Sequence, residues 1–128
     1  AYRSNDQGSL LALATKTGRL FLARIAPDDP TGAGVIVTEL PQPPGGVASL
    51  ALEASLEHLY VGTTDGHLLH VGASETQPPE IRASYAVAGP TTAISMLGFL
   101  SGDRSLVVMA ADGAVSTWGL VRRSDVPT

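Results

Sequence analysis

The sequence predicts an all-β protein made of repeated units of four short antiparallel strands, and three observations support this prediction. One apolar stretch with a central turn occurs three times, at residues 11–21, 59–69 and 106–116. The glycines of these copies, Gly18, Gly66 and Gly113, are separated by 48 and 47 residues, and a fixed period of this size is typical of repeat architectures. The apolar spacing of an amphipathic helix is sustained nowhere.

Each copy is expected to form a β-hairpin, because apolar, partly β-branched runs lie on both sides of a short turn. A tight hairpin turn needs a positive φ angle, which glycine adopts freely and aspartate tolerates. We therefore expect a β-branched residue at either Asp-Gly glycine to damage folding more than any surface charge reversal. The residues assigned to the turns are Gly18, Asp65, Gly66, Asp112 and Gly113.

The first unit, residues 1–44, is expected to be incomplete. Residues 2–9 contain a turn-forming cluster at 5–8 that leads into its hairpin, and the hairpin's second strand is expected at 19–25. A run of β-branched residues at 35–40 predicts the last strand of the unit. The first strand of this unit is therefore expected to precede residue 1.

The second unit, residues 45–89, has all its parts, with strands expected at 47–52, in the hairpin 59–71, and at 81–88. The third unit, residues 90–128, has a strand expected at 91–99 and a hairpin at 106–120, and its fourth strand is expected after residue 128. Four short strands per period, separated by loops rich in glycine and proline, are the layout of a propeller blade. The whole chain is thus predicted to be one part of a β-propeller, with about three blade-like units of which the first and last are incomplete.

A partial ring of this kind leaves apolar sheet faces or strand edges without a neighbour, because blades cover one another's faces. We therefore expect the fragment to pair with itself or to rearrange its terminal strands.

Composition narrows the classes of function. The 128 residues carry a net charge of −4, and their basic residues are scattered, so no basic surface for nucleic acid is predicted. The absence of cysteine excludes disulfides, thiolate metal sites and thiol catalysis. The longest mostly apolar runs, residues 93–100 and 106–111, are far shorter than the roughly 20 residues of a membrane-spanning helix.

No catalytic, cofactor or metal site is predicted. Phosphate-binding loops, zinc-protease motifs and nucleophile-elbow motifs are all absent. His67 and His70 suggest a metal site, but three residues apart on a strand they are expected to point to opposite faces. Asp28-Asp29 is interpreted as a solvated turn.

Two other kinds of side chain are candidates for binding. Arginine binds phosphate through its guanidinium fork, although the candidates here are interpreted as surface charges. Trp118 is the largest apolar side chain and is expected to pack between blades, or alternatively to lie at an interface with a partner. The candidate arginines are Arg19, Arg24, Arg82 and Arg104.

The third hairpin resembles the end of a WD repeat, because residues 112–120 include Trp118 followed by Gly119, where that family usually has aspartate. In that family the aspartate belongs to a polar network that ties the blade together. The equivalent pairs of the other units, Ala23-Arg24 and Val71-Gly72, do not preserve it either. Residues 59–69 are equally similar to the repeats of quinoprotein-type propellers, without the tryptophan of their consensus.

Residues 92–100, 105–108 and 113–123 also resemble the soluble insertion in enlarged permease subunits of some bacterial phosphate-specific ABC importers. In that family the insertion follows the first membrane helix. The resemblance therefore implies a parent protein anchored in the bacterial inner membrane, with this domain on the periplasmic side.

Three functional interpretations follow. The first is a non-catalytic accessory domain of a phosphate permease, which would dock the solute-binding protein or another transporter subunit. The alternative is a free-standing propeller scaffold for protein assembly. The third is an enzyme of quinoprotein type, which would need a cofactor pocket along the ring axis.

Overall fold

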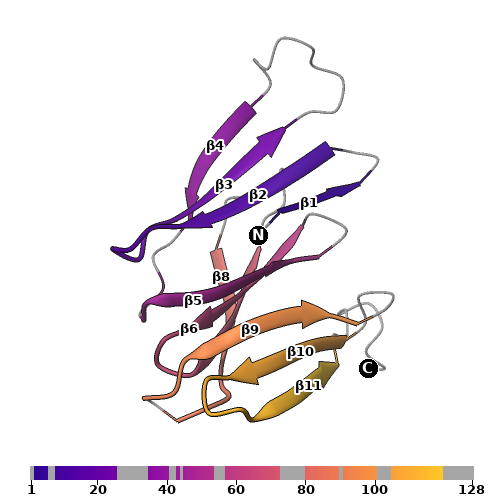
Figure 1. Ribbon diagram of the computed structural model, residues 1–128. Coiled ribbons are helices and arrows are strands. Elements are labelled where there is room, and N and C mark those ends of the chain that lie inside the picture. The colour runs from indigo at the N-terminus through magenta and orange to yellow at the C-terminus, as the bar shows by residue number, and fades with distance from the viewer. Residues whose placement is uncertain are drawn as a thin grey trace.

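The computed structural model describes residues 2–5, 8–25, 35–40, 43, 45–53, 57–72, 80–89, 91–100 and 105–119. All regular elements in these ranges are β-strands, which form three antiparallel sheets (Figure 1). The prediction of an all-β fold is confirmed. No helix in this part of the chain is long and apolar enough to cross a membrane.

The first sheet has four strands in the order of the sequence. The residue pattern predicts only three strands in this unit, but the residues before the hairpin form a further strand that pairs with it. The register pairs Asn5 with Gly8 and Tyr2 with Leu11. The strands are β1 (Tyr2–Asn5), β2 (Gly8–Ala14), β3 (Leu20–Ile25) and β4 (Val35–Leu40).

The second and third sheets follow the same plan. The second sheet contains β5 (Val47–Leu52), β6 (His58–Thr63), β7 (His67–Gly72) and β8 (Glu80–Ala86), in that order. The third sheet contains β9 (Ile94–Phe99), β10 (Ser105–Ala110) and β11 (Val115–Gly119), with β10 in the middle. The sheets lie one above another, with the second sheet between the other two (Figure 1).

The three central hairpins are alike. Their turn glycines have positive φ angles of 89°, 83° and 90° at Gly18, Gly66 and Gly113. In the first and third hairpins the amide of this glycine donates to a carbonyl three residues earlier, that of Thr15 or Ala110, at 3.0 Å. The repeat found in the sequence is therefore a repeat of the same turn.

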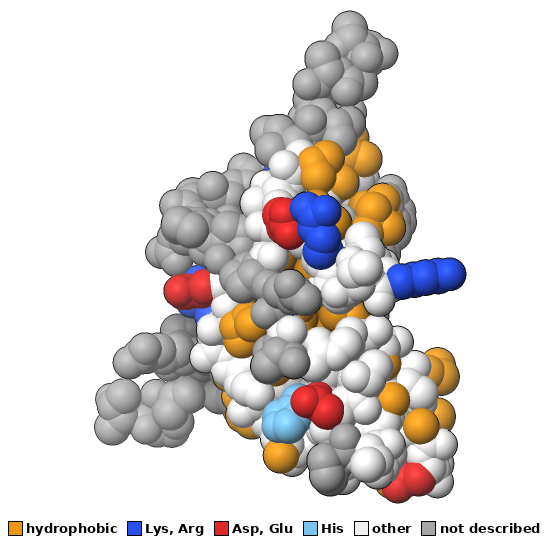
Figure 2. Space-filling view, turned by 90° about the vertical axis from the view of Figure 1, so that its left-hand side faces the viewer, with side chains coloured by type: hydrophobic (Ala, Val, Ile, Leu, Met, Phe, Trp, Pro, Cys, Tyr) orange, Lys and Arg blue, Asp and Glu red, His pale blue; other side chains and the backbone are white. Residues whose placement is uncertain are grey.

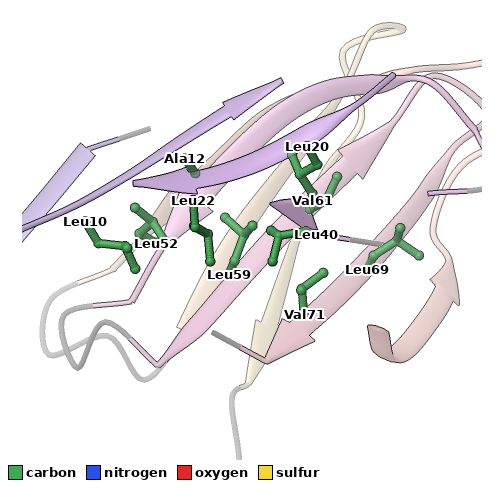
Figure 3. Close-up of a cluster of buried hydrophobic side chains, with 10 residues drawn as sticks. All are labelled: Leu10, Ala12, Leu20, Leu22, Leu40, Leu52, Leu59, Val61, Leu69 and Val71. Atoms are coloured by element: carbon green, nitrogen blue, oxygen red, sulfur yellow. The ribbon is translucent and has the colours of Figure 1, made fainter. Parts of the chain in front are cut away.

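A first apolar core fills the space between the first and second sheets (Figure 3). Side chains alternate between the two faces of a strand, so β6 turns Leu59 and Val61 towards the first sheet and Tyr60 towards the third. The buried members of this core are Leu10, Ala12, Leu20, Leu22, Leu40, Leu52, Leu59, Val61, Leu69 and Val71.

A second core joins the second and third sheets, and here the two sheets come very close at Gly62. Ser49 on β5 donates a hydrogen bond to the Ile94 carbonyl on β9 at 2.7 Å. A Cβ atom at Gly62 would collide with the Ser49 hydroxyl and would lie 2.6 Å from Cγ2 of Ile94. The buried members of this core are Ala51, Tyr60, Leu68, Ile94, Leu106 and Val108.

Candidate interaction surfaces

The stack of three sheets exposes one apolar face at each end. Figure 2 shows exposed hydrophobic side chains over the upper and the lower parts of the molecule, while basic side chains are few and separate in this view. By strand alternation and register, the first-sheet end face consists of Leu11, Leu13, Phe21, Ala23, Ile25 and Val37. The third-sheet end face consists of Met96, Val107, Met109, Val115 and Thr117.

Both end faces contain large hydrophobic side chains that are strongly exposed. Leu13 and Val37 on the first-sheet end face are 50% and 63% exposed, and Met96 and Val115 on the third-sheet end face are 60% and 58% exposed. On the third sheet, Met109 is the cross-strand neighbour of both Met96 and Val115, so these side chains form one continuous patch. Contiguous exposed apolar surface of this kind is a candidate interaction site.

The first-sheet end face carries one ion pair at its edge. Arg19 donates two hydrogen bonds to the Glu39 carboxylate, at 2.9 and 3.1 Å, and its guanidinium lies 5.0 Å from the centre of the Phe21 ring. The hydrogen bond from Arg19 lowers the pKa of Glu39, and the same contact raises the pKa of Arg19. Arg19 therefore already has an anionic partner, and its exposed side chain agrees with its interpretation as a surface charge.

The described ranges contain two further candidate arginines, which lie on different sheets. Arg24 lies on β3 and Arg82 on β8, whereas Arg104 and Asp28-Asp29 lie outside the described residues. Within the described ranges, no three His, Cys, Asp or Glu side chains form a group that could hold a metal ion.

Trp118 lies at the margin between the second and third sheets. It is half-buried against the second core, its ring centroid is 5.4 Å from that of Tyr85 on β8, and its Nε1 donates to Oγ of Ser116 at 3.1 Å. Tyr85 is 44% exposed, so one side of the pair packs against the protein and the other side is exposed to solvent. A role of Trp118 at an interface with a partner remains a prediction.

The Asp65 carboxylate takes part in the turn of the second hairpin. It accepts a hydrogen bond from the Thr63 hydroxyl and lies 3.3 Å from Nδ1 of His67. These contacts lower the pKa of Asp65, with the bond from Thr63 as the main cause. Its contacts thus make Asp65 part of the turn.

This turn geometry recurs in the first hairpin, where the backbone N–H of Arg19 donates to the Thr15 hydroxyl at 3.0 Å. The equivalent bond in the second hairpin runs from the backbone N–H of His67 to Thr63, at 2.9 Å. In the third hairpin the Asp112 carboxylate instead accepts the backbone N–H of Ala114, at 3.0 Å. Each turn thus uses a side-chain oxygen to bind a backbone amide, although the residue that supplies it changes.

The structure brings together two histidines that the sequence analysis did not pair. Nδ1 of His58 and Nε2 of His70 are 2.9 Å apart, and His70 stacks on Tyr60 with ring centroids 5.0 Å apart. Tyr60 in turn meets Phe99 of the third sheet edge-on at 5.8 Å. The Asp65-Gly66 turn fixes the register that places both histidines on one face, so the register of the predicted hairpin was the signal that could have found this pair.

Acid is expected to weaken the fold through this pair. Burial, His58 and Arg82 lower the pKa of His70 to about 4. Between pH 6.5 and 4 the unfolded chain therefore binds more protons than the folded chain. The stability that is present above pH 6.5 is lost as the pH falls through this window. Because His70 is only half-buried, we expect a loss of roughly 1 to 2 kcal/mol by pH 4.

Urea unfolding at a series of pH values measures this effect. His70→Gln should flatten the dependence between pH 6.5 and 4, whereas His67→Gln on the same strand should leave it in place. An unchanged slope in His70→Gln would contradict the assignment. Asp65 also has a lowered pKa, but its contribution to stability is lost at pH values below this window.

Comparison with known proteins identifies the fold. No family model and no curated protein matches the sequence. Among solved structures, the chain is similar to the β-propeller domain of Cps50 (Swd1) from Myceliophteria thermophila, with 25% identity and a TM-score of 0.69 over 94% of this chain. It is also similar to the WD40 β-propeller domain of Doa1, with 18% identity and a TM-score of 0.63 over 92% of this chain.

The chain spans 37% and 36% of the lengths of these two structures. The three stacked sheets are therefore part of a β-propeller of WD-like architecture, as the repeat predicted. Neither comparison supports the resemblance to the permease insertion.

Proposed function

We propose that this part of a WD-like propeller serves as a non-catalytic scaffold for protein assembly. The observation that carries the proposal is the architecture itself, in which stacked sheets present exposed apolar and aromatic surface. The described residues contain no cluster of three or more metal ligands, and the Asp65 carboxylate is bound within its own turn. WD40 propellers among the structural neighbours favour the same interpretation.

The aromatic pair of Tyr85 and Trp118 is the surface that we assign to a protein partner. Tyrosine and tryptophan are enriched at the centres of protein interfaces, because they bury a large apolar area while their polar ends keep a hydrogen bond. Trp118 already has its N–H satisfied by Ser116, so a partner can cover the ring without leaving a buried donor unpaired. The pair is fixed by the packing of two sheets, which reduces the entropy lost on binding.

Proximity labelling with the complete gene product tests this function. Partner proteins that the unsubstituted protein labels should no longer be labelled by the Tyr85→Ser variant. They should still be labelled by the Ser84→Ala variant, which is changed on the same strand. The loss should occur without a change in the unfolding midpoint, because Tyr85 is largely outside the buried cores. If the unsubstituted protein and Tyr85→Ser labelled the same proteins, the aromatic pair would not be the partner site. If the unsubstituted protein labelled only the proteins that the labelling enzyme alone labels, the proposed scaffold function would be wrong.

A phosphate permease context remains a separate prediction, which depends on the resemblance of residues 92–123. It places the domain in the periplasm, with the solute-binding protein or another transporter subunit as partner. An antibody against this domain on fractionated cells, followed by protease treatment of spheroplasts, tests it. A membrane signal that protease removes would support this context, and a signal in the soluble fraction would exclude it.

A further inference from the structure

Two histidines meet on the face of the second sheet that is turned towards the third sheet. His58 begins β6 and His70 lies on β7, and Nδ1 of the first is 2.9 Å from Nε2 of the second. Strand alternation places both on the same face as Tyr60, which belongs to the second core. The second sheet lies between the other two (Figure 1), so the pair is not on an end face of the stack.

Packing holds the two rings in position. His70 stacks on the buried ring of Tyr60 with an angle of 12° between the ring planes, and Tyr60 contacts Phe99 of β9 edge-on. The register sets His70 opposite Tyr60 and His58 opposite Gly72, so the two histidines are diagonal neighbours on paired strands. Rings that are positioned before a ligand arrives lose less entropy when they bind it.

The pair has the chemistry of a metal chelate. A hydrogen bond between two imidazole rings requires one of them to offer an unprotonated nitrogen, and neutral imidazole nitrogen is a ligand for zinc, copper and nickel. If a metal ion replaces the shared hydrogen, each neutral ring keeps its own hydrogen on its other nitrogen, Nε2 of His58 and Nδ1 of His70. Both facing nitrogens then offer a lone pair, and the ligands need not lose a proton.

The spacing of the two nitrogens favours one coordination geometry. With metal–nitrogen bonds of about 2.0 to 2.1 Å, ligands at 90° to each other are about 2.9 Å apart, whereas ligands at the tetrahedral angle are about 3.3 Å apart. The observed 2.9 Å matches the first arrangement. Square-planar and tetragonal nitrogen sites are typical of Cu²⁺ and Ni²⁺, and Cu²⁺ binds most tightly in the divalent series.

The surroundings allow an ion to enter and leave positions on it open. Both histidines are half-buried, so solvent reaches the pair. In the part of the chain that the structure describes, no third His, Cys, Asp or Glu joins them in a group that could hold a metal ion. Water or a ligand from solution would therefore occupy the remaining coordination positions.

Charges of both signs lie near the pair. Arg82 on β8 is close enough to repel a positive charge on His70. Glu53 is 5% exposed, and its backbone N–H donates to the His58 carbonyl at 3.0 Å. Because Ala51 lies in the second core, alternation places Glu53 on the same face as His58. A cation at the pair thus meets a negative group as well as the opposing charge of Arg82.

We propose that His58 and His70 chelate one Cu²⁺ ion at adjacent coordination positions, with solvent at the others. This metal-binding site goes beyond the proposed scaffold function and does not depend on it. The other histidine of the chain, His67, lies three positions before His70 on β7 and therefore on the opposite face of the sheet.

Calorimetric titration of the tag-free 128-residue chain with copper(II) chloride at neutral pH tests the proposal. We expect one ion per chain, and an electron paramagnetic resonance spectrum with the splitting of two nitrogen ligands. His58→Gln and His70→Gln should each raise the dissociation constant at least about tenfold, because a single imidazole lacks the chelate. His67→Gln is the matched control and should leave the dissociation constant unchanged.

The unfolding midpoint provides a second measurement. Cu²⁺ should raise the urea midpoint of the unsubstituted chain, because the unfolded chain does not hold the two rings together, and should not raise that of His58→Gln or His70→Gln. Midpoints in a metal-free buffer with chelator show whether each variant is folded. Magnesium chloride should give neither heat nor stabilisation, because Mg²⁺ requires oxygen ligands.

Arg82→Gln tests the position of the ion. Removing the opposing charge should tighten Cu²⁺ binding about twofold to tenfold. Weaker binding by this variant, with an unchanged midpoint in the metal-free buffer, would contradict an ion beside His70.

Three results would overturn the proposal. One is that the unsubstituted chain binds Cu²⁺ no more tightly than both His58→Gln and His70→Gln. Another is a spectrum with a single nitrogen ligand. The third is a loss of affinity in His67→Gln as large as in the other two variants, which would place the ion at the turn that contains Asp65 and His67.

Discussion

Replacing Gly66 with valine is expected to lower the free energy of unfolding by about 2 to 5 kcal/mol. Gly66 has a φ of 83°, and its carbonyl accepts hydrogen bonds from the N–H groups of Val87 and Ala88, at 2.9 and 3.0 Å. A Cβ atom there would lie 2.6 Å from the carbonyl oxygens of both Ala88 and Gly89. The left-handed backbone costs about 1 to 2 kcal/mol for a residue with a Cβ atom, and displacing this backbone adds about 1 to 3 kcal/mol.

Gly113 provides the matched control for this prediction. Its φ of 90° is nearly the same, but a Cβ atom there would have no other atom within 4 Å. Gly113→Val should therefore lower the free energy of unfolding only by the conformational cost, about 1 to 2 kcal/mol. Lys16→Glu on the exposed first turn should lower it by less than about 0.5 kcal/mol. Urea unfolding at neutral pH measures all three. Equal midpoints for Gly66→Val and Gly113→Val would show that crowding against residues 88–89 contributes nothing.

The second large effect is expected at the junction of the second and third sheets. Gly62→Val should separate these sheets, because the new side chain would occupy the space of the Ser49 hydroxyl and of Ile94. The Ser49 hydrogen bond to the Ile94 carbonyl would be lost, and the Ile94 side chain, which is fully buried, would have to move. We expect a destabilisation of about 3 kcal/mol or more. Quenching or exposure of Trp118, which packs in the same core, gives a fluorescence measure of the separation.

Gly98→Val separates this effect from the general consequence of adding a side chain to a strand. Gly98 is on β9, and a Cβ atom there would have no other atom within 4 Å. Valine favours strands more than glycine does, so stability should stay the same or rise slightly. If Gly62→Val retained both the parent's midpoint and its fluorescence, the close approach of these two sheets would not be a constraint on the fold.

The residue pattern was sufficient to predict the strands that have their own local signal. Strands β4 and β5 coincide with the predicted ranges 35–40 and 47–52, because continuous β-branched or apolar runs between glycine and proline residues are readable without any partner. Strand β1 was missed because Tyr2–Asn5 has no apolar run, and its strand conformation depends on pairing with β2.

The candidate site residues also include some that have a local sequence signal and others that depend on contacts between strands or sheets. The turn positions Asp65 and Gly66 could be assigned from two adjacent residues, because a tight turn is specified by the backbone preferences of its own residues. The pairs His58 with His70 and Tyr85 with Trp118 join residues from different strands or sheets. The register that brings the two histidines together follows from the position of the Asp65-Gly66 turn. The contact of Tyr85 with Trp118 depends instead on how two sheets stack, which no short stretch of sequence encodes.

The sequence by itself thus determined the all-β class, the 48- and 47-residue repeat and the hairpin turns, because these follow from local φ preferences and from alternation along a strand. Only the tertiary structure decided which face of each sheet is covered. Every strand here has two faces, and burial of Leu59 and Val61 against one neighbour and of Tyr60 against the other is settled by the stacking of whole sheets. The same stacking leaves Leu13 and Val115 exposed at the two ends, because no third pair of faces is buried between these three sheets.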